Sequence, residues 1–109
     1  MTGSEFRAVR LKLGHAADQR QSYIDWRLLV HGSIRRGHIM TRFSVSEGQA
    51  SADINAFLTA HPDAVSYDKS AKQYIPANGR YRSQRGWTPR KLAAWEAAAD
   101  AGIEWAWRD

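Results

Sequence analysis

The chain has 109 residues, the size of one domain, and its lack of cysteine excludes disulfides and thiolate metal sites. A hydrophobic content of 43% with five tryptophans favours a folded protein, and no apolar run approaches the about 20 residues that span a bilayer. The formal net charge of +5 at pH 7 favours a polyanionic partner. Residues 1–14 lack the apolar core of a secretory signal, so we expect a cytoplasmic protein.

Residues 1–14 form an N-terminal arm whose structure the pattern leaves open. Apolar residues between Phe6 and Leu13 partly alternate with basic ones, which fits a short strand. A basic helix or a flexible arm fits the same residues about as well. In each case Gly14 is expected to close the segment.

The stretch from Ala16 to His31 predicts the first helix of the domain. Its apolar residues form one broad face and comprise Tyr23, Ile24, Trp26, Leu28 and Val30. Gly32 is a candidate C-terminal cap of this helix. Ile34 then returns to the core as a candidate short strand that pairs with a later hairpin.

Two shorter helices follow, joined by a tight turn. Residues 36–43 place apolar side chains on one helical face at Ile39, Met40 and Phe43. The turn brings Val45 inward, and Ser46 is expected to cap the next helix. This layout predicts a helix-turn-helix whose second member enters the major groove of DNA.

The second of these helices runs to Ala60-His61, because Pro62 disfavours helical geometry at the residue before it. It has a regular apolar stripe, made of Ala50, Ile54, Phe57 and Leu58. We expect the opposite face to be polar, with Glu47, Gln49, Ser51, Asp53 and Asn55.

Residues 64–76 predict a β-hairpin, since two short alternating runs flank a turn at residues 68–72. A hairpin directly after a helix-turn-helix is the wing of a winged helix. Lys69 and Lys72 lie at its expected tip, where a phosphate backbone would pass.

Residues 77–87 are interpreted as an exposed basic linker with Arg80, Arg82 and Arg85. Residues 88–109 are interpreted as an amphipathic helix and a tryptophan-rich tail. Thr88 followed by Pro89 predicts the start of the helix. The fold class is therefore α+β, mainly α. It is a winged helix-turn-helix over residues 15–76, with a three-helix core, a wing and an additional C-terminal helix.

The expected DNA contacts divide into two groups. Contacts to base edges are assigned to Gln49, Ser51 and Glu47, although Glu47 also fits the helix dipole and an exposed polar face is the alternative for all three. Contacts to the phosphate backbone are assigned to Arg35, Arg36, Arg42, Ser46, Lys69, Lys72, Arg80 and Arg82, with ordinary surface charge as the alternative. Asp53 has the same two alternatives as Glu47, a base contact or the helix dipole, and it fits an ion pair with Arg42 equally well.

The expected dimer interface consists of Leu92, Trp95, Trp105 and Trp107, since aromatic residues concentrate binding energy at two-fold interfaces. The tryptophans fit equally well packed back onto Trp26 and the first helix. No histidine pair has metal-ligand spacing, and there is no nucleophile-elbow or glycine-rich phosphate loop. We therefore expect no enzymatic activity, no metal and no cofactor.

Four stretches carry a resemblance to a known family: HGSIRR at 31–36, FSVS at 43–46, QASADI at 49–54 and YDKSAKQY at 67–74. They resemble the BrxR/CapW-type transcriptional repressors of bacterial phage-defence islands, within the winged-helix regulators that carry WYL domains. The resemblance covers residues 23–76, about half of the chain. It implies a homodimer that binds an inverted repeat in a bacterial promoter, in the nucleoid.

Two departures limit what the resemblance implies. Ser44 stands at a turn position where the family often has glycine, so we expect an altered turn. Family members usually continue into a WYL ligand-sensing domain, which this sequence does not contain, so ligand sensing is not carried over. A second function stays open, in which the winged helix is a protein-interaction module that binds a host or phage-defence factor through its tryptophan-rich end.

Overall fold

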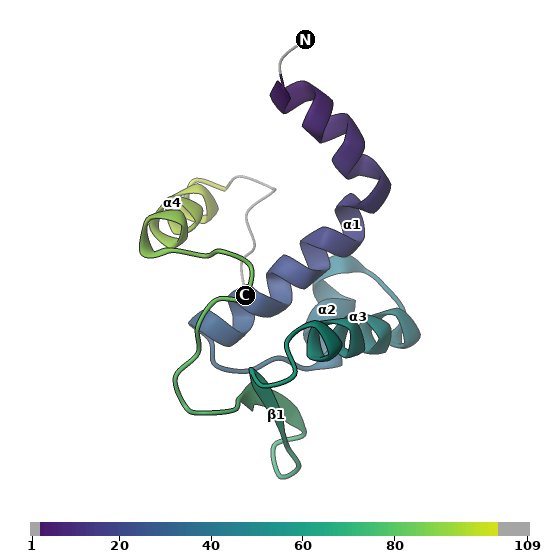
Figure 1. Ribbon diagram of the computed structural model, residues 1–109, viewed down its shortest axis with the longest axis vertical. Helices are drawn as coiled ribbons and strands as arrows, with labels where there is room; N and C mark the ends of the chain where they lie inside the picture. Colours follow the sequence, from purple (N-terminus) through teal and green to yellow (C-terminus); the bar gives the residue numbers. More distant parts are fainter. Residues whose placement is uncertain (1–2, 103–109) are drawn as a thin grey trace.

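The computed structural model describes the backbone of residues 3–102 and the side chains of residues 16–102 apart from Ala99. Helix α1 (Gly3–Val30) runs through the centre of the molecule, and α2 (Arg36–Phe43) and α3 (Glu47–Ala60) pack on one side of it (Figure 1). The three helices enclose the main hydrophobic core.

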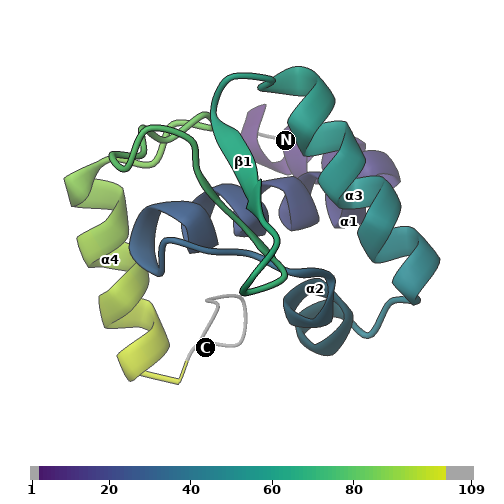
Figure 2. The same cartoon turned by 90° about the horizontal axis from the view of Figure 1, so that it is seen from below.

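Two further elements complete the fold. Strands β1 (Val65–Asp68) and β2 (Gln73–Pro76) form an antiparallel hairpin in which Tyr67 lies opposite Tyr74. Helix α4 (Pro89–Asp100) lies on the opposite side of α1 from α3 (Figures 1 and 2). The predicted fold, a winged helix-turn-helix with an additional C-terminal helix, is confirmed.

Helix α1 begins at Gly3 and continues through Gly14, where the sequence predicted a break. The helical alternative for the N-terminal arm is therefore the one present from Gly3 onward. A glycine inside a helix costs only about 0.5–1 kcal/mol relative to alanine, which a helix of 28 residues with a packed C-terminal half can absorb. The arm and the first predicted helix are one element.

The turn after α1 connects the helical core to the wing. Gly32 has φ of 73°, and its N–H donates to the carbonyl of Arg27 at 3.0 Å. Ile34 is buried and forms an isolated bridge to Tyr74, with N–O distances of 3.0 and 2.9 Å. The predicted pairing of Ile34 with the hairpin is confirmed, and it ties the hairpin to the core.

The predicted apolar stripes of all three helices meet in one core. Its buried members are Tyr23, Ile24, Trp26, Leu28, Ile34, Ile39, Ala50, Ile54 and Phe57, with Met40, Phe43, Val45 and Leu58 packed at its edge. The prediction was wrong for Val30, which is 41% exposed. Val30 is the last residue of α1, so no further helical turn covers it.

The turn between α2 and α3 has two notable serines. Ser44 adopts the left-handed conformation, with φ of 54° and ψ of 46°. Ser46 caps α3 as predicted, since its hydroxyl accepts the N–H of Gln49 at 3.1 Å. These two residues set the angle at which α3 leaves α2.

Residues 77–87 were interpreted as an exposed linker, and this was wrong for Tyr81, Ser83 and Trp87, which are partly buried and bonded to α1. The carboxylate of Asp25, 0% exposed, accepts the hydroxyl groups of Tyr81 and Ser83 and the backbone N–H groups of Gln84 and Arg85, at 2.6–3.0 Å. Burial, and then the hydrogen bond to Asp25 and its charge, raise the pKa of the Tyr81 phenol well above its usual range. A sequence run that looked like a linker is thus part of the folded unit.

This segment delivers α4 to its place. The hydroxyl of Thr88 accepts the N–H of Lys91 at 3.1 Å, so the predicted cap is confirmed. Leu92 and Trp95 pack against the core cluster, and the rings of Trp87 and Trp95 meet edge to face with centroids 5.3 Å apart. Trp95 therefore packs on its own chain, whereas Trp105 and Trp107 lie outside the described residues.

Candidate nucleic-acid interface

The polar residues of α3 lie on two flanks of the helix. Residues two positions apart in an α-helix are separated by about 200° around the axis. The five residues predicted to form one polar face, at every second position from 47 to 55, therefore alternate between two sides of α3. Asp53, moreover, is buried at 5% exposure. The prediction of a single polar face is therefore wrong. The outermost part of α3 between the flanks carries mostly small side chains, such as Gly48 and Ala52.

The first flank faces the wing and contains Glu47, Ser51 and Asn55. Arg36, at the start of α2, joins two of them, since Nη1 donates to Oε1 of Glu47 and to Oγ of Ser51, both at 3.3 Å. The side chains of Arg36 and Glu47 are 53% and 69% exposed, so this is a solvated surface pair. Both partners remain accessible to a ligand.

A groove of about 500 Å³ separates this flank from the wing. Its lining includes Arg35 and Arg36 at the start of α2, Ser51 and Asn55 of α3, and Lys72 of the wing. Among the described residues that line it there are three cations and no carboxylate. The groove therefore suits an anionic chain that passes between α3 and the wing.

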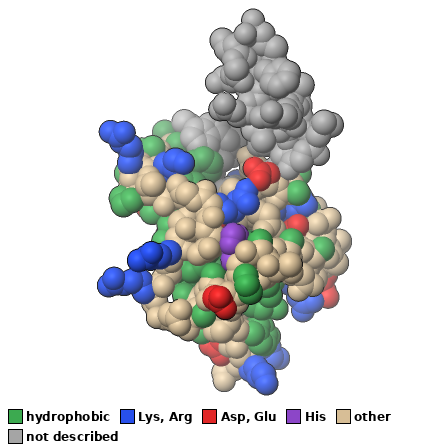
Figure 3. Space-filling model, viewed as in Figure 1, with side chains coloured by type: hydrophobic (Ala, Val, Ile, Leu, Met, Phe, Trp, Pro, Cys, Tyr) green, Lys and Arg blue, Asp and Glu red, His purple; other side chains and the backbone are tan. Residues whose placement is uncertain are grey.

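The wing has a well-defined tip. The carboxylate of Asp68 accepts the N–H groups of Ser70 and Ala71 at 3.0 and 3.1 Å, which closes the turn. Lys72 follows in the left-handed conformation, with φ of 54°. The tip also contains Lys69, and Figure 3 shows basic side chains (blue) at the lower end of the molecule. The wing thus presents positive charge next to α3.

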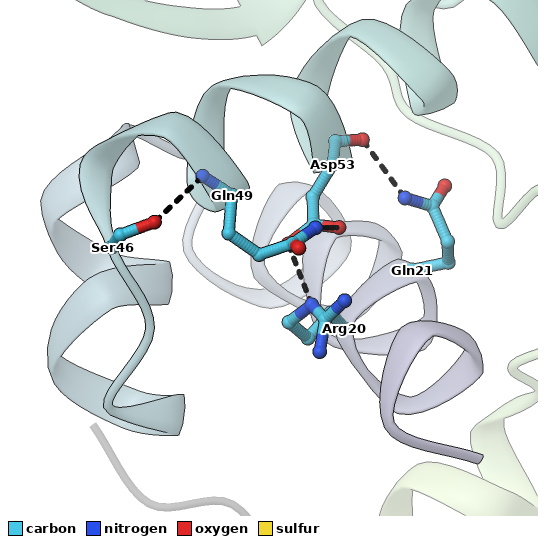
Figure 4. Close-up of polar contacts among 5 residues, drawn as sticks. All are labelled: Arg20, Gln21, Ser46, Gln49 and Asp53. Atoms are coloured by element: carbon cyan, nitrogen blue, oxygen red, sulfur yellow. Dashed lines mark hydrogen bonds and ion pairs between the residues drawn. The ribbon is translucent and has the colours of Figure 1, made fainter. Parts of the chain in front are cut away.

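The second flank of α3 contains Gln49 and Asp53 and faces α1 (Figure 4). The carboxylate of Asp53 pairs with Nε of Arg20 at 2.6 Å and accepts Nε2 of Gln49 at 3.0 Å. Gln21 donates to the backbone carbonyl of Asp53 at 2.8 Å. The alternative in which Asp53 pairs with Arg42 is therefore wrong, and the Arg42 guanidinium lies over the Phe43 ring, 5.6 Å from its centroid.

The remaining predicted cations do not lie in the groove. Arg80 and Arg82 line a different hollow, at the C-terminal end of α3 beside His61. Arg85 forms an ion pair with Asp18 and donates to the hydroxyl of Ser22 at 3.1 Å. The structure brings together Arg35, Arg36 and Lys72, and it separates them from the arginines of residues 80–85.

Two residues of the groove were not predicted as contacts. Asn55 is exposed beside Ser51, and a carboxamide is well suited to the edge of adenine. Tyr67 is 49% exposed on the wing, with its ring 4.9 Å from that of Tyr74. The helical spacing of four residues from Ser51 to Asn55 is a sequence feature that would have indicated the first. Nothing in the sequence pattern indicates the second.

Among the described side chains, those of residues 16–102 apart from Ala99, no cluster of three or more histidine, aspartate or glutamate side chains is arranged to hold a metal ion. Across the same residues, no helix combines the length and apolarity needed to cross a membrane.

Comparison with known proteins covers the helices α2 and α3, the wing and part of α1. Residues 16–81 match the sequence model of a family described as the BrxR transcriptional regulator winged helix-turn-helix domain. Two proteins named DNA-binding transcriptional repressor CapW, one from Escherichia coli strain KTE188 and one from Escherichia coli, are each 35% identical over 57 residues. These residues make up 52% of this chain and 19% of each relative, so the chain spans about a fifth of their length. The matching family is one of transcriptional regulators and not of enzymes, as predicted.

Proposed function

Because the chain belongs to the family of BrxR transcriptional regulator winged helix-turn-helix domains, we propose that it is a transcriptional repressor. In this proposal it binds an inverted-repeat operator in double-stranded DNA as a homodimer. The observation that carries the proposal is the groove between α3 and the wing, where Arg35, Arg36 and Lys72 surround polar residues of α3 without a carboxylate among the described lining residues. An α-helix fits the major groove of DNA, and cations beside such a helix can contact the DNA phosphates.

The proposed contacts follow from the two flanks of α3. With α3 in the major groove, Ser51 and Asn55 on one flank and Gln49 on the other reach base edges. Arg35, Arg36 and the wing lysines Lys69 and Lys72 contact phosphates, which fix the position of the domain without recognising sequence. Glu47 takes part through its bond to Arg36, and Ser46 keeps its role as a helix cap. Arg42, Arg80 and Arg82 do not line this groove.

The repressor role is proposed from the relatives, which are named as DNA-binding transcriptional repressors. A dimer would place two copies of α3 in successive major grooves about 34 Å apart on one side of the duplex. Bound over a promoter, it would exclude the polymerase. We propose α4 as the dimer contact. Leu92 and Trp95 are only partly buried by their own chain, so the part of each side chain that stays accessible would contribute, together with Trp105 and Trp107.

A second candidate function is favoured by one observation. A largely apolar hollow of about 360 Å³ lies between α1 and α4 and is lined by Trp87, Ala94 and Trp95, among others. A hollow of this kind can also hold a segment of a partner protein, which is the adaptor alternative. Binding of a partner that is unaffected by Gln49→Ala would support this alternative over the repressor.

The proposal is tested by selecting bound duplexes from a random pool with the 109-residue protein. We expect one motif to emerge, present as two inverted half-sites whose centres are about one helical turn apart. Recovery of unenriched sequence at every salt concentration would contradict the proposal and favour the adaptor.

A further inference from the structure

Gln49 lies at the end of a chain of three charged and polar side chains that begins on α1. Arg20 of α1 pairs with Asp53 of α3, and the same carboxylate accepts the side-chain amide of Gln49 (Figure 4). The side chains of Arg20 and Asp53 are only 11% and 6% exposed, whereas Gln49 is an exposed residue. A buried pair thus supports one residue on the surface of α3.

The buried pair is not explained by stability alone. Removing two charges from water costs free energy that their attraction often fails to exceed, and an apolar pair of similar size would hold α1 and α3 together as well. Gln21 already provides a second contact at this point, through its bond to the Asp53 carbonyl. The charge of Asp53 therefore has a consequence beyond joining the two helices.

That consequence is the orientation of the Gln49 amide. A carboxamide presents an acceptor, Oε1, and a donor, Nε2, and the two can exchange places by rotation of the group. An ionised carboxylate only accepts, so Asp53 holds Nε2 toward itself at 3.0 Å and leaves Oε1 directed away. The second N–H of Nε2 stays available. The exposed edge of Gln49 therefore has a fixed order of acceptor and donor.

An acceptor and a donor in fixed order match the major-groove edge of adenine, which offers N6–H as donor and N7 as acceptor. Gln49 also lies in the first turn of α3, and N-terminal residues of a recognition helix are those that contact bases. We propose that Arg20 and Asp53 are positioning residues that hold Gln49 ready to recognise one adenine of the operator. This inference rests on the proposed function, since it requires α3 to enter the major groove.

The experiment measures selectivity at single base pairs, with the motif selected by the wild-type protein as the reference duplex. Each A·T pair is replaced in turn by G·C, and the ratio of the two dissociation constants is measured by fluorescence anisotropy. Unfolded protein lowers the active concentration equally for both duplexes, so this ratio does not report a loss of stability. For wild type we expect a ratio of about 5 to 150 at the pair that Gln49 contacts.

Three variants test the chain of side chains. Gln49→Ala is expected to bring the ratio at that one pair close to 1. Asp53→Asn keeps the volume but lets the amide of Gln49 rotate, and we expect the ratio to fall at least about threefold at the same pair. The double variant Arg20→Met/Asp53→Leu replaces the buried pair by apolar residues, which such sites tolerate. It provides a folded test if the single change destabilises the protein.

Asp63→Asn is the matched control, because it removes one negative charge from an exposed position after α3 and should leave every ratio unchanged. Wild-type ratios in Asp53→Asn and in the double variant would overturn the inference, even if their melting temperatures fall. The inference also fails if Gln49→Ala loses selectivity at no A·T pair. Absence of any selected motif for the wild type is a different result, and it contradicts the proposed function itself.

Discussion

The hydroxyl of Tyr81 donates to the carboxylate of Asp25 at 2.7 Å and so joins the segment before α4 to the buried face of α1. Asp25 accepts three more hydrogen bonds from the same segment, and a fully buried carboxylate requires such donors. The hydroxyl of Ser83, one of these donors, in turn accepts the N–H of Trp87 at 2.8 Å. Asp25 is therefore one of the residues that fix the position of α4, beside the packing of Leu92 and Trp95.

Asp25→Asn is expected to destabilise the protein by about 1–3 kcal/mol, because an amide turns a donor toward groups that themselves donate. The free energy of unfolding in urea measures this. Asp63→Asn, an exposed change of the same chemistry, should have almost no effect. Equal stability of the Asp25 variant and wild type would mean that the four hydrogen bonds contribute little.

Because of Tyr81, we expect the protein to become less stable at alkaline pH. Its pKa in the folded protein is raised above the ordinary value near 10. Between these two pKa values the unfolded chain has lost the proton and the folded chain has kept it, so the free energy of unfolding falls as the pH rises above about 10. Below pH 10 the contribution is fully present.

The measurement is urea unfolding of wild type and Tyr81→Phe from pH 8 to pH 11. The difference in stability between the two proteins should be constant up to about pH 10 and should then shrink, since phenylalanine has no proton to lose. Parallel curves over the whole range would show that the Tyr81 phenol is not perturbed.

Ser44→Gly is expected to stabilise the protein. Ser44 occupies the left-handed region, which costs a residue with a side chain about 1–2 kcal/mol. Glycine avoids this cost but loses more backbone entropy on folding, so the net gain should be about 0.5–1 kcal/mol. Thermal unfolding measures the change.

The control for Ser44→Gly is Ser70→Gly, at a turn serine whose φ is not positive. This control should lower the melting temperature or leave it unchanged. A lower melting temperature for Ser44→Gly would indicate that its side chain, and not its backbone conformation, matters at the turn.

The sequence was sufficient to predict those parts of the fold that depend on local spacing. Apolar residues such as Ile39 and Ile54 recur with the period of a helix, and Ser46 and Thr88 have the chemistry of caps. Helical periodicity and helix caps both depend on residues only a few positions apart in the sequence. The order of three helices, a hairpin and a fourth helix followed from them.

The misses have physical reasons. Asp25 lies in an otherwise apolar run, which indicates a buried charge, but its partner Tyr81 is 56 residues away and no local pattern identifies it. Asp53 was placed on a solvated face because charge alone suggested it, whereas the helical position puts it against α1. Gly14 was weighed as a break although one glycine does not end a long helix. The sequence placed the candidate site on α3 and the wing, but the division of α3 into two flanks follows only from its packing against α1.

We expect the wing lysines to bind the phosphate backbone of DNA. Lys72→Asn keeps the left-handed backbone, which asparagine tolerates, and removes one charge from the groove. We expect weaker binding to every duplex and a log–log salt slope that is smaller in magnitude by about 0.9. Lys91→Gln, on α4 and outside this groove, should leave the slope unchanged. A change in base preference, with the slope unaltered, would contradict a phosphate contact.

The most direct test of the central claim, that α3 and the wing bind DNA with sequence preference, is equilibrium binding by fluorescence anisotropy. The 109-residue protein is titrated onto the selected duplex and onto a shuffled duplex of equal length, over a series of salt concentrations. We predict binding to the selected duplex at least about 1,000-fold tighter, with log affinity falling linearly with log salt. Equal affinity for both duplexes, or no binding at low salt, would contradict the claim.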